Sequence, residues 1–234
     1  MNRSIRLRAL RAAFPATIPI LAGFLFLGMT YGVLMNASGF SPLYPFCTSL
    51  FIFAGSMEFV TANLLLAAFH PLQAFLLTLM INARHLFYCI SMLEKYREVP
   101  GLRRVYMIFG LCDESFSVNY AADVPLDVDR NWFMFFVTLL NQSYWVAGAT
   151  LGGVFGSLLR FNTAGLDFAM TAMFTVILLE QVLKRENRLN AAIGIGCSLL
   201  CLLIFGAGDF LIPTMLLIVA CLSFAGRARG GDGA

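Results

Sequence analysis

The length of its apolar blocks constrains this chain most. Hydrophobic residues make up 59% of its 234 residues and charged residues only 12%, against roughly 25% charged residues in a typical soluble domain. The apolar residues run in blocks of about 20 or more, and ~20 helical residues at 1.5 Å each cross ~30 Å of hydrocarbon. The sequence therefore predicts an all-α, polytopic helical integral membrane protein.

Short links separate the expected membrane segments. These segments are residues 12–36, 43–69, 72–93, 105–122, 131–159, 164–183 and 189–225, the last being long enough for two helices broken at 206–209. We expect seven or eight segments, at least one of them broken or re-entrant, because residues 105–122 hold too few apolar residues for an ordinary span. Together they form one transmembrane domain, 12–226, between a basic N-terminal tail, 1–11, and a flexible C-terminal tail, 227–234.

Charged residues are concentrated outside the apolar blocks. Of the 29 Asp, Glu, Lys and Arg residues, 21 lie in five loop or tail patches: 3–11, 94–104, 123–130, 184–188 and 227–232. Four others stand well inside apolar segments: Glu58, Arg84, Asp113 and Glu114. An ionised group in the hydrocarbon costs ~2.5 kcal/mol or more, so such groups normally face a protein interior or a wet cavity and have a partner.

The second block carries a polar interruption at its centre. Gly55, Ser56 and Glu58 stand there in the run Phe53–Phe59. This pattern is typical of a broken transporter helix, whose freed backbone groups must find ligand, water or protein. The alternative is a protonated glutamate held in a helix interface. We favour the functional interpretation because an uncompensated buried carboxylate is costly.

The third block has a polar side. On one helix, Asn82, His85 and Cys89 would share a face, with Arg84 and Tyr88 on the adjoining strip. The alternative is that Arg84 and His85 extend toward a nearby membrane interface, since charged residues follow from position 94.

The adjacent acidic pair Asp113 and Glu114 offers partners for Arg84. Such a pairing would offset part of the cost of all three charges. In the segment 131–159, Trp145 lies among polar residues that could line a cavity or bond between helices. Downstream of it, three glycines, Gly148, Gly152 and Gly156, recur every four residues and predict close helix packing.

Several function classes lack sequence support. The six cysteines form no CxxC pair and the two histidines no metal-ligand spacing, so we expect neither a disulfide framework nor a metal site. No phosphate-binding GxxxxGK[ST] motif and no hydrolase signature occurs. We therefore expect no cofactor, no nucleic-acid partner and no enzymatic activity.

The orientation in the membrane stays open. The basic stretches 3–11, 184–188 and 227–229 share a side if all eight segments cross, and the positive-inside rule makes that side cytoplasmic. The basic loop 94–104 then lies outside, against the rule. If either 43–69 or the segment after this loop is re-entrant, seven crossings remain and one end changes side.

The polar motifs resemble those of the AzlC family of branched-chain amino acid permeases. The likeness runs through most of the chain: Phe-Ala-Gly-x-x-Gln-Phe at 53–59, Asn-x-Arg-His-x-x-Tyr at 82–88, Asp-Glu-x-Phe at 113–116, Trp-x-x-Gly-x-x-x-Gly at 145–152 and Leu-Asp-Phe at 166–168. One position departs, because the family usually has glutamine where this chain has Glu58. The added carboxylate could change substrate preference or supply a proton site.

This resemblance implies the large subunit of a proton-driven exporter. Its substrates would be branched-chain amino acids, with methionine a further candidate. The chain would be a multi-pass protein of the bacterial inner membrane, and it would act in the lipid bilayer with a small AzlD-like membrane subunit. A passive channel or pore for small amphiphilic solutes is the alternative, as is a transporter of another small substrate.

The expected mechanism is alternating access around a midplane site. Arg84 and the helix break after Gly55 would bind the substrate carboxylate. Either Glu58 or the pair Asp113 and Glu114 would bind its ammonium group. Glu58 or His85 would carry the coupling proton. The candidate substrate- or proton-binding residues are Gly55, Glu58, Asn82, Arg84, His85, Tyr88, Asp113, Glu114 and Trp145.

Overall fold

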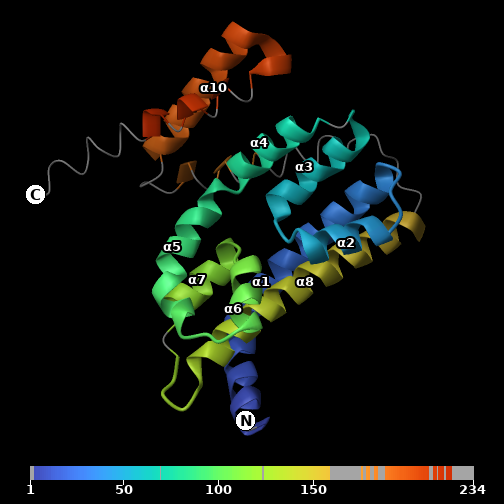
Figure 1. Cartoon of the computed structure of the whole chain (residues 1–234). Coiled ribbons are helices and arrows are strands. Elements are labelled where there is room, and N and C mark those ends of the chain that lie inside the picture. The colour runs from blue at the N-terminus through green and yellow to red at the C-terminus, as the bar shows by residue number, and fades with distance from the viewer. Residues whose placement is uncertain are drawn as a thin grey trace, which may run out of the picture. The chain divides into compact units, whose positions relative to one another are not determined.

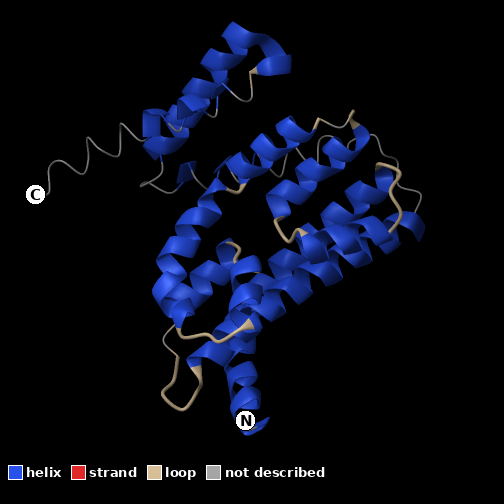
Figure 2. Cartoon of the chain, in the orientation of Figure 1, coloured by secondary structure: helices blue, strands red, loops and turns tan. Residues whose placement is uncertain are grey.

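The computed structural model is helical throughout the part of the chain that it describes. That part comprises residues 3–68, 70–122, 124–158, 175, 178–179, 182–183, 188–210, 213–214, 216–218 and 220–222. Within these residues there are helices, turns and loops and no strand, which confirms the all-α class (Figure 2). Most of the predicted segment 164–183, with Leu166–Phe168 inside it, lies outside the described residues, as does the tail 227–234.

The chain divides into two compact units, residues 1–163 and 164–234. The helices of the first unit are α1 (Arg3–Ala37), α2 (Leu43–Phe51), α3 (Gly55–Leu66), α4 (Pro71–Ile81), α5 (Ala83–Arg97), α6 (Leu102–Phe109), α7 (Asp113–Ala121) and α8 (Arg130–Leu158). They are labelled in Figure 1. Because α1 begins at Arg3, the basic residues 3–11 form its first turns. The single transmembrane domain predicted over 12–226 stays a prediction.

Two long helices, α1 and α8, form the scaffold of the first unit and run parallel, side by side (Figure 1). Glycines allow their backbones to approach closely. A Cβ added at Gly32 would overlap backbone atoms of Ala149 and Gly153, and one added at Gly152 would overlap the backbone of Met29. The glycines predicted to pack do so, because only a residue without a Cβ fits between two backbones at this distance.

Helices α2 and α3 form a hairpin that turns back beside the middle of α8. Near its start α2 packs against Gly153, and near its end the backbone oxygen of Leu50 accepts a hydrogen bond from Gln142 Nε2, 3.0 Å away, eleven residues lower on α8. Gly55, the first residue of α3, then lies against Trp145, and the chain returns along α1. Phe53 makes the turn with φ 45°, a left-handed conformation that is strained for a bulky residue.

A second hairpin, α6 and α7, enters from the other end of the scaffold. Arg103 at its start lies over the Trp132 ring, and Gly110 at its tip contacts Thr138, about two turns higher on α8. Helix α7 then runs back beside α5, and Lys95 Nζ donates to the backbone oxygen of Tyr120 over 2.7 Å. With 8 and 9 residues, each arm is roughly 12–14 Å long at 1.5 Å per residue, about half the hydrocarbon thickness.

The segment predicted as one span over 72–93 is broken at Asn82. Its two halves, Ala74–Ile81 and Ala83–Arg97, meet at an angle of 47°. Asn82 has φ −93° and ψ 5°, outside the helical region. Asn82 is the N-cap of α5, and its backbone oxygen accepts a hydrogen bond from the His85 N–H, so of the predicted shared face only His85 and Cys89 lie within α5.

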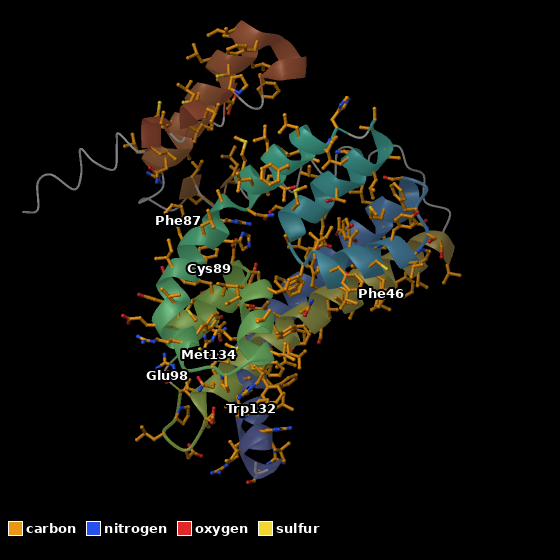
Figure 3. The ribbon with its side chains drawn as sticks, viewed as in Figure 1. Phe46, Phe87, Cys89, Glu98, Trp132 and Met134 are labelled. Atoms are coloured by element: carbon orange, nitrogen blue, oxygen red, sulfur yellow. The ribbon has the colours of Figure 1, made fainter. Side chains whose placement is uncertain are left out.

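One end of the first unit is basic and aromatic. The guanidinium carbons of Arg6 and Arg103 lie 4.6 Å and 4.1 Å from the centre of the Trp132 ring. Figure 3 shows Trp132 and Glu98 toward this N-terminal end and Phe46 of α2 toward the other. A core cluster that includes Met92, Met107 and Met134 packs next to it. The N-terminus of α1, the link between α5 and α6 and the start of α8 therefore share one end.

By length and composition, two of the described helices are apolar enough to cross a membrane: α1 over Ser4–Ala37, and α10 (Arg188–Asp209) over Arg188–Gly206. The bent pair α4 and α5 is a third if it forms one span. Helix α8 has 29 residues but carries the amides Asn141 and Gln142 near its centre, so by composition alone it is not among the candidate membrane spans. In the second unit, Gly206 interrupts α10 with φ 72°, within the break predicted at 206–209.

Candidate functional site

Three helix breaks of the first unit meet around Arg84. The hairpin tips lie close together, since a Cβ added at Gly110 would come within 4.0 Å of Phe53 Cε1. Arg84, in the first turn of α5 after the break at Asn82, contacts the first turns of both α3 and α7. Helix N-termini present unpaired N–H groups and positive dipole ends, so three of them face this region.

The predicted partner of Arg84 is present. Its Nη1 atom lies 2.7 Å from Asp113 Oδ2, and its Nη2 donates a longer bond of 3.4 Å to Ser56 Oγ. The two charged side chains keep 45% and 37% of their surface exposed, so a ligand can reach the guanidinium. Arg84 thus bridges the first hairpin to the second through contacts that a ligand can reach.

Glu58 lies fully buried one turn into α3, with unequal oxygens. Its Oε1 accepts bonds from Trp145 Nε1 at 2.9 Å and from the backbone N–H of Ala54 at 3.1 Å. Its Oε2 is buried with no partner among the described residues. The Trp145 ring also covers Gly55, where an added Cβ would come within 3.1 Å of Cη2. Gly55, Glu58 and Trp145 therefore form one contact group.

The remaining candidates on α5 are His85 and Tyr88, which flank Arg84 in the sequence and make contacts other than with Glu58. His85 Nδ1 lies 3.2 Å from the backbone oxygen of Asn82, and its ring meets that of Tyr88 edge-on with centroids 5.7 Å apart. Tyr88 stacks on Phe116 of α7 at 4.5 Å. These contacts pack α5 against the second hairpin. The rings of His85, Tyr88 and Phe116 form a continuous set of aromatic contacts next to Arg84.

Sequence reasoning left part of the site's polar network outside the candidate set. Ser115 Oγ, fully buried, accepts bonds from Asn141 Nδ2 at 3.2 Å and from the Cys112 thiol at 3.3 Å. Asn141 Oδ1 has no partner among the described residues. Glu114 is half-buried beside Asp113, and the ion pair recorded for Arg84 is with Asp113 alone. The polar centre of α8 offered a signal for Asn141, whereas nothing in the sequence tied Ser115 to it.

The described residues around Arg84 offer a cation and hydrogen-bond acceptors rather than a cluster of metal ligands. Among the described residues no three His, Cys, Asp or Glu side chains group to hold a metal. Instead Arg84 is a reachable cation beside Asp113, whose Oδ1 is buried without a partner among the described residues, and Glu58 Oε2 on α3 is a second buried acceptor of this kind. Buried polar atoms are nearly always hydrogen-bonded, so atoms like these mark places where water or a ligand binds.

Comparison with known families assigns the chain. The family model described as AzlC protein matches residues 19–159, which include both hairpins, Arg84 and Trp145. The chain belongs to the AzlC family. This confirms the resemblance read from the motifs, and with it that the chain is a transport protein rather than an enzyme.

Curated relatives agree with the family. The chain is 60% identical over 215 residues to the branched-chain amino acid transport protein AzlC of Bacillus subtilis, covering 92% of this chain and 84% of the relative. It is 50% identical over 208 residues to an uncharacterized membrane protein of Haemophilus influenzae, covering 89% and 85%. It is also 26% identical over 218 residues to the inner membrane protein YgaZ of Escherichia coli, covering 88% and 86%. No solved structure matches the chain.

Proposed function

We propose that this AzlC-family chain is a secondary transporter that exports branched-chain and other apolar amino acids across the bacterial inner membrane, driven by protons, by alternating access. The observation that carries the proposal is Arg84 bridging the first turns of two helical hairpins. Transporter sites are typically built at the midplane from such broken helices. The branched-chain transport named for the Bacillus subtilis relative supports the substrate class.

The proposed substrate pose uses the groups left without a full set of partners. The substrate carboxylate binds Arg84, replacing part of its contact with Asp113. The ammonium group binds Glu58 Oε2, or the acidic pair at the start of α7. Phe116 and the other apolar side chains nearby contact the substrate side chain. Charge-assisted bonds of this kind are about twice as strong as neutral ones and fix the orientation of the ligand.

The coupling proton is assigned to Glu58 or His85. Glu58 is buried and hydrogen-bonded through one oxygen only, so its second oxygen is available to hold a proton. A glutamine at this position, as the family usually has, could not do so. Export by Glu58→Gln at an unchanged dependence on the proton gradient would remove Glu58 from this role.

We further propose that both hairpins are re-entrant. Then α1, the bent pair α4–α5 and α8 each cross the membrane, and the two hairpins enter it from opposite sides. Three predicted crossing segments follow α8. The chain then has eight membrane segments, of which six are crossings and two are re-entrant hairpins. All four basic stretches, 3–11, 94–104, 184–188 and 227–229, then share one side. By the positive-inside rule that side is the cytoplasm. The conflict left by the sequence disappears because six crossings, not seven or eight, are counted.

Cysteine labelling tests the first hairpin. Ser38 and Ala68 flank α2 and α3, so Ser38→Cys and Ala68→Cys should both react with a membrane-impermeant maleimide added to intact spheroplasts. Glu98→Cys, at the basic end, should react only after permeabilisation. Reaction of the first two from opposite sides would mean that α2 and α3 cross the membrane, contrary to the proposal.

The transport assay uses proteoliposomes with an imposed proton gradient. A small AzlD-like membrane subunit is proposed as the partner, so the assay is run with and without it, across leucine, isoleucine, valine, methionine and a charged amino acid. We expect apolar amino acids to accumulate against their gradient and the charged one not to. Flux that never exceeds equilibration would instead support a passive pore.

A further inference from the structure

A pocket opens between α5 and α6 near the basic end of the first unit, away from the residues of the candidate transport site. Its volume is about 510 Å³, within the range of small-molecule pockets. The residues that line it are Cys89, Leu93, Glu94, Tyr96, Arg97, Arg104 and Ile108. This lining is apolar on one part and charged on another.

The apolar and charged parts are ordered along the helices. On α5, Cys89, Leu93 and Arg97 follow at intervals of four residues and so lie on one face. On α6, Arg104 and Ile108 are spaced the same way. Helix α5 runs toward the basic end and α6 away from it, so both place the arginine at that end and the apolar side chain deeper. The groove is therefore amphipathic along its length.

The groove arginines stand next to the link between α5 and α6, Arg97 as the last residue of α5 and Arg104 in the first turn of α6. Arginine side chains near the ends of membrane helices extend to the interface, so in a membrane the two groove arginines would lie at headgroup level. Leu93, with 70% of its surface exposed, and Ile108, with 46%, lie farther from that end.

Among the described residues, no carboxylate forms an ion pair with either guanidinium of the groove. Arg104 donates from Nε to the Val99 oxygen at 2.8 Å and from Nη2 to the Arg97 oxygen at 2.7 Å, which orients the group but leaves its charge. The ion pair recorded in the described residues involves neither groove arginine. Glu94 also lines the pocket, so two cations face one anion.

We propose that this groove binds an anionic diacyl phospholipid from the leaflet at the basic end. The phosphodiester binds Arg97 and Arg104, and one acyl chain follows Leu93, Cys89 and Ile108. The argument for a lipid over a soluble anion is that the exposed apolar wall continues directly from the cations. The argument for an anionic headgroup is that two arginines face one carboxylate, which leaves a surplus of positive charge. Glu94 would repel a second negative group, so a headgroup with a single negative charge fits.

Thermal unfolding of the purified protein in neutral detergent tests this, with short-chain phosphatidylglycerol, phosphatidylcholine and inorganic phosphate as probes. We expect saturable stabilisation by phosphatidylglycerol alone. Arg97→Gln should weaken its apparent affinity roughly fivefold, the effect of one interfacial cation. Arg8→Gln, which removes a charge from the same end but not from the groove, is the matched control and should change it little. Glu94→Gln should strengthen binding.

Equal stabilisation by phosphatidylcholine, or stabilisation by phosphate alone, would overturn the proposal. So would equal losses in Arg97→Gln and Arg8→Gln, which would indicate a diffuse surface charge effect. A photoactivatable phosphatidylglycerol provides an independent readout and should crosslink within residues 89–108. Crosslinks confined to other segments would mean that the lipid binds elsewhere, contrary to the proposal.

Discussion

Two substitutions of Glu58 separate its structural role from its charge. Glu58→Gln keeps an Oε1 acceptor for Trp145 Nε1 and for the Ala54 N–H, the two bonds of 2.9 Å and 3.1 Å. Glu58→Met fills a similar volume but accepts neither bond. The structure therefore predicts a small effect for the first change and a large one for the second.

The magnitude follows from the donors left behind. An unsatisfied buried donor costs about 1–3 kcal/mol, so Glu58→Met, which orphans two, should lose about 2–6 kcal/mol of unfolding free energy. For Glu58→Gln we expect a loss below about 1 kcal/mol, because it keeps the one acceptor oxygen that serves both donors and removes a carboxylate from a buried site.

Reversible denaturation of the purified protein in mixed micelles, followed by tryptophan fluorescence, measures the difference directly. Trp145 reports on its own environment once Trp132, the second tryptophan, is replaced by phenylalanine in every variant. The reasoning is refuted if Glu58→Gln is as unstable as Glu58→Met, since the cost would then come from lost charge rather than from orphaned donors.

Three further changes probe the scaffold and the site. Gly32→Ala should lose about 1–3 kcal/mol through backbone overlap between α1 and α8, whereas Gly23→Ala, which meets nothing within 4 Å, should unfold at or above the wild-type temperature. Trp145→Phe should lose about 1–3 kcal/mol by removing the indole donor to Glu58 Oε1; because this change removes the fluorescent reporter, its denaturation is followed by circular dichroism. Combining Arg84→Glu with Asp113→Arg should restore more transport than either single change retains, and no recovery would argue against a functional pair.

The sequence allowed several elements to be predicted because their signals are local. The apolar blocks, the interruption at Gly55 and the glycine repeat on α8 each follow from a few neighbouring residues. The pairing of Arg84 with Asp113 was predictable for a different reason, because an intramembrane arginine has few acidic partners to choose from. The break at Asn82 was missed because no glycine or proline marks it, and the polar residues Asn82, Arg84 and His85 are equally compatible with one side of an unbroken helix.

Other features depend on contacts between distant segments. No local pattern shows that α3 runs back along α2, since the composition of a short apolar helix does not indicate the direction in which it runs. The contact of Trp145 with Gly55 and Glu58 likewise joins positions almost ninety residues apart. The proposal that both hairpins are re-entrant likewise rests on the order in which they contact α8.

The assignment of Arg84 to the substrate carboxylate is the central claim, and one binding measurement tests it most directly. Equilibrium binding of leucine and of isoamylamine, its decarboxylated analogue, is compared in the wild type and in Arg84→Gln. We predict that the wild type prefers leucine and that Arg84→Gln loses roughly 10-fold or more of that preference, the value of a charge-assisted bond. If Arg84→Gln binds with the full wild-type preference, the carboxylate is held elsewhere and the proposed site is wrong.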